Sequence, residues 1–141
     1  MIYTPTCQHA LRALTHLAGR PDRRPALVRD IAEAEDVPHQ FLSKILHDLR
    51  KKGFVQSKKG PGGGYFLAKP PADILVTDVV HAVDGTADLS KICVLGLDHC
   101  TDTDSCALHD LWTRFRDRFV TAMTPLTLHD LARTRARKRA R

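Results

Sequence analysis

The sequence predicts a mainly α-helical fold with one small β-hairpin, and two patterns indicate it. Apolar residues recur at helical spacing over the first fifty residues and again over residues 108–123. Between these regions, residues 54–57 and 65–67 have the composition of strands and flank a long glycine-rich loop. Three helices followed by a hairpin is the element order of a winged helix-turn-helix, so we expect that architecture with a long C-terminal helix added to it.

Local signals place the ends of the first helices. Thr4 and Pro5 suit the N-cap and the first residue of a helix, and Gly19 suits its end. A short helix is expected over residues 28–34, and Pro38 is expected to open the next one. These two helices are separated by a turn of only a few residues, as in a helix-turn-helix.

The helices after the hairpin follow a pair of prolines that breaks the chain. Thr77 is expected to cap a short helix that Gly85 ends. Pro125 interrupts the long apolar pattern, and one or two further helical turns are expected over residues 127–132.

The net charge of +6 is spread unevenly along the chain. Residues 1–69 carry 12 Lys and Arg against 6 Asp and Glu, residues 70–132 carry 4 against 10, and residues 133–141 carry 6 against none. The basic N-terminal half therefore suits a module that meets the phosphates of DNA. The basic tail is expected to be a disordered, solvated end, and additional non-specific contact with DNA is the alternative.

The helix that Pro38 opens is expected to enter the major groove of double-stranded DNA. Gln and Lys can read base edges, Lys also neutralises phosphates, and glycines in the hairpin loop allow close approach to the minor groove. The candidates for DNA contact are His39, Gln40, Ser43, Lys44, Lys51, Lys58, Lys59, Gly60 and Gly62. A basic helix face can also be merely solvated, so the prediction depends on the combination of helices, hairpin and charge.

Three of the four cysteines, Cys93, Cys100 and Cys106, lie within 14 residues, and His109 follows them. The spacing C-x6-C-x5-C-x2-H offers three thiolates and one imidazole, which suit a soft or borderline metal. A 2Fe–2S cluster can be held in this way, because His can replace a Cys ligand. A tetrahedral zinc ion and a metal-free thiol–disulfide switch are the alternatives.

The acidic residues of the cysteine loop and the fourth cysteine are not expected to bind a metal. Asp98, Asp102 and Asp104 are expected to be solvated residues of the cysteine loop, and Cys7 a small buried residue of the first helix.

Several classes of protein are disfavoured. No apolar run approaches the roughly 20 residues of a membrane span, and the start lacks the features of a secretory signal, so we expect a cytoplasmic protein without membrane contact. The chain has neither a Cys-x-x-Cys pair nor a His-Glu-x-x-His motif, which argues against a thiol oxidoreductase or zinc hydrolase. A protein-interaction adaptor is a further alternative, and its binding would lack the steep salt dependence of DNA binding.

Taken together, the residues resemble the iron–sulfur cluster regulators of the IscR and NsrR type, a family of bacterial winged-helix transcription regulators. The likeness extends over about residues 1–132. It includes residues 10–14 and 37–54, residues 50–55 leading into the glycine-rich loop, residues 78–80 and 83–85, the three cysteines and residues 108–112.

The resemblance implies a homodimer whose operator binding is controlled by a 2Fe–2S cluster that senses nitric oxide, iron or cluster status, or redox state. By position, the base-reading residues of the family fall on Gln40, Ser43 and Lys44, and its minor-groove contact falls on Lys59. Two-fold symmetry of the dimer implies a palindromic operator.

The resemblance also implies that the long C-terminal helix forms the dimer interface. The matching residues are Leu108, Leu111, Trp112, Phe115 and Phe119. Packing of this helix within one chain is the alternative. In some relatives the fourth cluster ligand comes from the partner chain, where Gln8 or His9 of the partner subunit would stand, so the fourth ligand is open between these and His109.

These interpretations divide the chain into four parts. We expect a winged helix-turn-helix DNA-binding domain over residues 1–85 and a cysteine-bearing sensor loop over residues 86–106. A dimerisation helix and a short C-terminal helix are expected over residues 107–132, and a disordered basic tail over residues 133–141.

Overall fold

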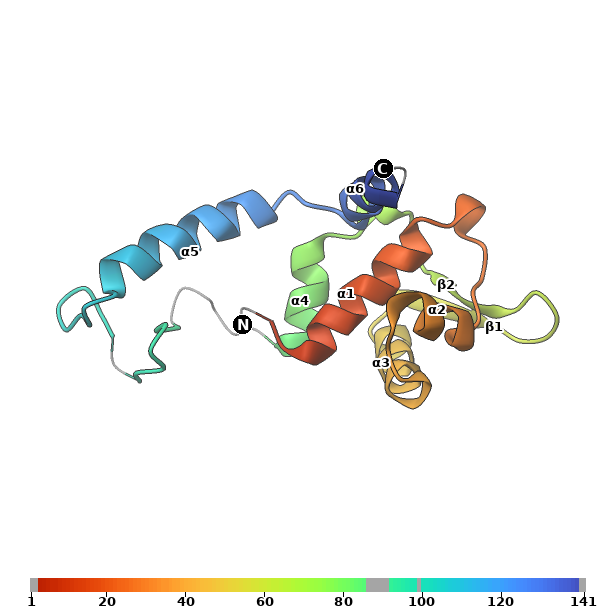
Figure 1. Cartoon of the computed structure of the whole chain (residues 1–141), viewed down its shortest axis with the longest axis horizontal. Helices are drawn as coiled ribbons and strands as arrows, with labels where there is room; N and C mark the ends of the chain where they lie inside the picture. Colours follow the sequence, from red (N-terminus) through yellow and green to blue (C-terminus); the bar gives the residue numbers. More distant parts are fainter. Residues whose placement is uncertain (1–2, 86–91, 99, 140–141) are drawn as a thin grey trace.

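A computed structural model describes residues 3–85, 92–98 and 100–139 of the chain (Figure 1). In chain order its elements are α1 (Pro5–Ala18), η1 (Pro21–Arg23), α2 (Val28–Glu35), α3 (His39–Lys51), β1 (Val55–Lys58), β2 (Gly64–Leu67), η2 (Pro71–Asp73), α4 (Val76–Asp84), α5 (His109–Met123) and α6 (Leu128–Arg139). The expected fold class, mainly helical with a small hairpin and a long C-terminal helix, is confirmed. No helix in these ranges has both the length and the apolar character that crossing a membrane requires.

Helix α1 lies at the centre of the fold. The hydroxyl of Thr4 accepts a hydrogen bond from the backbone N–H of Cys7 at 3.2 Å, and Pro5 stands at the first position, as expected from the sequence. The buried face of α1 packs against α2, α3, α4, α6 and β2. Leu14 and Leu17 on that face are 1% exposed or less, so α1 holds the other helices together.

A tight turn connects α2 to α3. Asp36 adopts a left-handed conformation with φ of 51°, and the backbone N–H of Val37 bonds to the carbonyl oxygen of Ala32. Val37 is buried, and so are Leu42 and Leu46 on the inner face of α3. The inner face is therefore anchored in the core, and the opposite face of α3 is left at the surface.

The hairpin is antiparallel and gains a third, single-residue partner. Val55 pairs with Leu67 in the ladder, and Ala26 exchanges two backbone hydrogen bonds of 2.8 Å with Tyr65. Gly64 has φ of 130°, and a Cβ atom there would lie 2.3 Å from the carbonyl oxygen of Ala26. Only glycine allows this approach, which fixes the hairpin to the segment before α2. We call the hairpin, residues 55–67, the wing.

Two expectations about the later helices are wrong. Helix α4 begins at Val76 with Leu75 as its N-cap, and Thr77 makes no cap hydrogen bond. The start of α4 is fixed by tertiary pairing instead, because Val76 N–H bonds to the carbonyl oxygen of Leu126 and Leu128 N–H bonds to that of Ile74. A local capping signal was outweighed by contact with a distant segment.

The tail expected to be disordered from residue 133 is helical as far as Arg139, the end of α6. Thr127 and Asp130 form a reciprocal capping box at its start, and Leu128 is fully buried. Alanine and arginine are favourable helix formers, and Arg135 pairs with Glu35 of α2 at 2.5 Å. Residues 140–141 lie outside the described part, as do residues 86–91 and 99 of the expected sensor loop.

Helix α5 differs from all the others. It projects away from the body of the molecule, and the segment with the cysteines lies at its far end, on the opposite side from the wing (Figure 1). Of its fifteen residues, all of them described, none is buried. We call residues 92–98 and 100–123 the arm, and the remaining described residues the body.

Candidate DNA interface and metal centre

The outer face of α3 presents polar side chains to solvent. Leu42 and Leu46 hold the inner face in the core, so residues at other helical positions point outward. Among the residues predicted to contact DNA, His39, Gln40, Lys44 and Lys51 are exposed and Ser43 is half-buried. These donors and acceptors share one helix, as reading a major groove requires.

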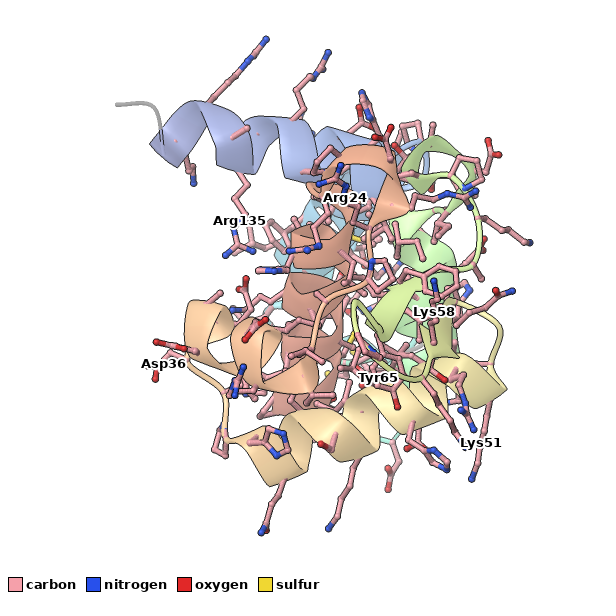
Figure 2. All side chains as sticks on the ribbon, turned by 90° about the vertical axis from the view of Figure 1, so that its right-hand side faces the viewer. Arg24, Asp36, Lys51, Lys58, Tyr65 and Arg135 are labelled. Atoms are coloured by element: carbon pink, nitrogen blue, oxygen red, sulfur yellow. The ribbon has the colours of Figure 1, made fainter. Side chains whose placement is uncertain are left out.

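The wing brings a second set of predicted residues to the surface. Lys58 and Lys59 are exposed, and Gly60 and Gly62 in the loop have positive φ of 88° and 71°. Figure 2 shows Lys58 on the wing and Lys51 at the C-terminal end of α3 on the same side of the body. A hydrogen bond of 2.9 Å from the guanidinium of Arg50 to the hydroxyl of Ser57 connects the two elements.

In the arm, three thiols lie within 4.8 Å of one another. The Sγ atoms of Cys100 and Cys106 are 3.6 Å apart, and those of Cys93 and Cys106 are 4.0 Å apart. All three cysteines are free, and Cys93 is buried. Residues separated by up to 13 positions thus converge on one point, which the sequence spacing alone predicted only as a possible ligand set.

His109, the first residue of α5, completes this group. Its Nδ1 atom lies 3.2 Å from the Sγ atom of Cys100, and its Nε2 atom lies 2.9 Å from a carboxylate oxygen of Asp102. The backbone N–H of His109 bonds to the carbonyl oxygen of Cys106, which sets the spacing between these two residues. The structure therefore groups the three predicted cysteine ligands and places the predicted His109 beside Cys100, in the lining of the same pocket.

The backbone around Cys93 favours its thiolate. Hydrogen bonds from the backbone N–H groups of Leu97 and Leu95 lower the pKa of the Cys93 thiol. Gly96 between them has φ of 71°, a conformation that turns neighbouring N–H groups in one direction. A thiolate is the form of cysteine that binds a metal, so this turn favours Cys93 as a metal ligand.

The pocket at this site suits an added group. It is an open cavity of about 470 Å³, lined by the three cysteines, His109, Trp112 and Thr113 among others. The hydroxyl oxygen of Thr113 is buried and has no hydrogen-bond partner within the described part of the chain. A buried polar atom of this kind ordinarily has a partner, so the pocket fits a bound group that accepts a hydrogen bond.

The distances also bear on the kind of metal. Four ligands at 2.3 Å from one tetrahedral ion lie about 3.8 Å from each other. The sulfur separations of 3.6 and 4.0 Å are close to that value. Three cysteines and one histidine also supply the four ligands that a 2Fe–2S cluster requires, two for each iron, so the residue types fit either group.

The fourth cysteine plays no part in this site. Cys7 is fully buried in a small cluster with Val76 and Val80, as expected from the sequence. Burial raises the pKa of its thiol to about 12, and the nearby carboxylate of Asp84 adds to this effect.

The apolar residues predicted for a dimer interface lie along α5. Leu111 is 69% exposed and Phe115 is 50% exposed, and Leu108 is exposed as well. Trp112 stacks on Phe115 at 5.8 Å between ring centroids, and Phe115 stacks on Phe119 at 6.2 Å. Phe119 also contacts the ring of Tyr3 at 6.2 Å, so the described residues leave mainly Leu108, Leu111 and Phe115 of this strip uncovered.

Reasoning from the sequence missed the contacts of two carboxylates. Asp102, expected to be only solvated, bonds to His109, and a loop carboxylate of this kind carries no periodic signal. Glu35 is 2% exposed and pairs with Arg12, His16 and Arg135. Figure 2 shows Arg135 reaching from α6 toward α2.

Comparison with known proteins places these features in a family. The model of the Rrf2 family, described as an iron-dependent transcriptional regulator, matches residues 3–134. The transcriptional regulator IscR of Photorhabdus laumondii is 32% identical over 131 residues, which cover 93% of this chain and 79% of that protein. A putative transcriptional regulator of Aquifex aeolicus is 35% identical over 133 residues, covering 93% of this chain and 91% of the relative.

Solved structures show the same fold. The global cysteine regulator CymR of B. subtilis superimposes with a TM-score of 0.75 at 25% identity, covering 93% of this chain and 95% of that chain. IscR of T. potens gives a TM-score of 0.71 at 24% identity, covering 93% of this chain and 85% of that chain.

Proposed function

Since the chain belongs to the Rrf2 family of transcriptional regulators, we propose that it binds a palindromic operator as a homodimer and that a 2Fe–2S cluster in the arm controls this binding. That it is a DNA-binding regulator, and not an enzyme, follows from the family. The observation that carries the regulatory part is the convergence of three thiols and one imidazole on a single pocket.

Cys93, Cys100, Cys106 and His109 would hold the cluster. When bound, a 2Fe–2S cluster supplies one-electron redox chemistry, with a potential that His ligation raises. Nitric oxide, iron or cluster supply and oxidants are the signals that would act on it. The residues of the chain provide the thiolates, the imidazole and a buried hydroxyl donor in Thr113.

The uncovered surface of α5 supports the homodimer. An apolar strip that includes Leu111 and Phe115 is costly to leave in water, and a second copy of the same helix can cover it. Pairing through α5 would also place two copies of α3 in a two-fold arrangement, which matches a palindromic operator. We assign Leu108, Leu111, Trp112, Phe115 and Phe119 to this interface.

The exposed residues of α3 and the wing would make the DNA contacts. Gln40, Ser43 and Lys44 stand where side chains can reach base edges, and Lys58 and Lys59 stand where a wing meets phosphates and the minor groove. We retain the proposed division into DNA-binding domain, sensor loop and dimerisation helix. The basic tail is no longer a separate part, because it belongs to α6 as far as Arg139.

A single zinc ion on the same four residues is the second candidate. Two of the three sulfur separations are close to 3.8 Å and all three are within 4.8 Å, which favours binding of the thiols to one tetrahedral ion. Zinc would make the arm a structural element, with no redox response.

The visible absorption spectrum of protein purified without oxygen, together with its metal content, separates these candidates. Iron, inorganic sulfide and absorption between about 400 and 600 nm, all lost in Cys106→Ala, are the results that the cluster predicts. Cys7→Ala is the matched control, because it removes a thiol outside the pocket and should keep the colour. A colourless protein with one zinc ion per chain would replace the cluster by the second candidate.

A further inference from the structure

We propose that Asp102 is a positioning residue that holds His109 in the tautomer and orientation needed to bind the metal through Nδ1; this rests on the proposed metal centre. The imidazole of His109 has two different neighbours. Its Nδ1 atom faces the Sγ atom of Cys100 at 3.2 Å, on the side of the thiols, and its Nε2 atom faces the carboxylate of Asp102 at 2.9 Å.

The chemistry of the pair determines which nitrogen is free. An ionised carboxylate can only accept hydrogen bonds, so the Nε2 atom carries the proton and donates the hydrogen bond to Asp102. In the neutral ring, Nδ1 then has a lone pair directed at the thiols. Metal-bound histidines in proteins commonly make this kind of contact through the nitrogen that does not bind the metal.

A tight turn fixes the backbone at Asp102. Thr101 and Asp104 exchange two backbone hydrogen bonds of 3.1 and 3.2 Å, which closes a tight turn around residues 102 and 103. The hydroxyl of Thr101 also accepts a bond of 3.1 Å from the N–H of Asp104. The position of Asp102 is thus set by the backbone, only two residues after the ligand Cys100.

Solvent exposure limits the size of the effect. The side chain of Asp102 is 98% exposed, whereas that of His109 is 13% exposed. Water competes for the carboxylate, so the contact should contribute near the lower end of the 10- to 100-fold range found for outer-sphere partners of metal ligands. We expect loss of Asp102 to weaken metal binding about tenfold.

The test compares Asp102→Ala with Asp104→Ala, which removes an equal charge from the same turn, and with Asp102→Glu, which keeps an acceptor. Asp104 is a suitable control because the contacts described for it use only its backbone. The first readout is the tautomer of His109 in metal-free, reduced protein, measured from its imidazole ¹⁵N chemical shifts. The second is the affinity for Co²⁺, followed by its visible absorption.

The proposal predicts that His109 carries its proton on Nε2 in the wild type, in Asp104→Ala and largely in Asp102→Glu. In Asp102→Ala the two tautomers should mix, and the affinity for Co²⁺ should fall about tenfold. Equal tautomer populations and equal affinities in the two alanine variants would overturn the proposal. If the wild type bound neither Co²⁺ nor a cluster, the proposed metal centre would fail, and the tautomer measurement would still decide whether Asp102 positions His109.

Discussion

The body and the arm are stabilised in different ways, although apolar residues are no scarcer in the arm than in the body. The body buries Leu14, Leu42, Leu46 and others around α1, so its fold is determined within one chain. In the arm Cys93 is the only buried apolar residue among those described, and every residue of α5 is at least partly exposed. The proposed second copy and bound metal would supply contacts that the arm lacks within the described part of the chain.

The largest effect should come from the core of the body. Leu46→Ala removes a fully buried side chain and should lower the free energy of unfolding by about 2–5 kcal/mol. Leu111→Ala, on the exposed face of α5, should leave the stability of the separated chain within about 0.5 kcal/mol but weaken the dimer. Urea unfolding and sedimentation equilibrium measure the two effects. A Leu111→Ala protein that unfolds as readily as Leu46→Ala and remains dimeric would contradict the proposed difference between the core of the body and the exposed face of α5.

The next effect concerns the contact of α6 with the body. Glu35→Ala leaves Arg135 and His16 without their buried acceptor and should cost about 1–3 kcal/mol, less than a fully buried pair because Arg135 is 28% exposed. The exposed Arg29–Asp30 pair is the control, since Asp30→Ala should change stability by less than about 0.5 kcal/mol. Equal losses in the two variants would show that burial of Glu35 does not matter.

A smaller effect is expected in DNA binding. Lys59→Ala at the tip of the wing should reduce the slope of log affinity against log salt concentration by about 1, because one phosphate contact is lost. Lys138→Ala, an exposed residue of α6, should leave that slope unchanged. Fluorescence anisotropy with a labelled duplex at several salt concentrations gives both slopes, and an equal reduction in the two variants would contradict the assignment of the wing.

The smallest effect is a dependence of stability on pH. Burial lowers the pKa of His16 in the folded protein, and the nearby Glu35 only partly opposes this. The unfolded chain, with an ordinary histidine pKa of about 6.5, therefore binds a proton more readily than the folded chain. This contribution to stability is complete above that pH and is lost as the pH falls below it. His16→Gln should flatten the acid side of a plot of unfolding free energy against pH, and an unchanged profile would exclude His16 as the cause.

The sequence predicted some elements of the body better than others for physical reasons. Helical periodicity and the signals at Thr4, Pro5 and Pro38 are local, and the core packing agrees with them. Helix α4 was misplaced because its start depends on pairing between residues 74–76 and 126–128, which no local pattern records. The order of α6 likewise depends on a distant carboxylate, Glu35.

The candidate site was predictable only in part. The residue types and spacing of Cys93, Cys100, Cys106 and His109 indicated a ligand set, since few other groups bind soft metals. The contact between Asp102 and His109 depends on a turn in an irregular loop, and the orphaned hydroxyl of Thr113 depends on how α5 meets that loop. Neither leaves a periodic trace in the sequence.

The most direct test of the account is whether the state of the arm changes DNA binding by the body. The affinity for a duplex selected from a random-sequence pool would be measured for wild type and Cys106→Ala, each before and after anaerobic treatment with iron and sulfide. We expect a change of about 5- to 150-fold in the wild type, the usual range for coupled sites, and no change in the variant. Equal affinities for the wild type in both states would contradict the claim that the cysteine site controls DNA binding.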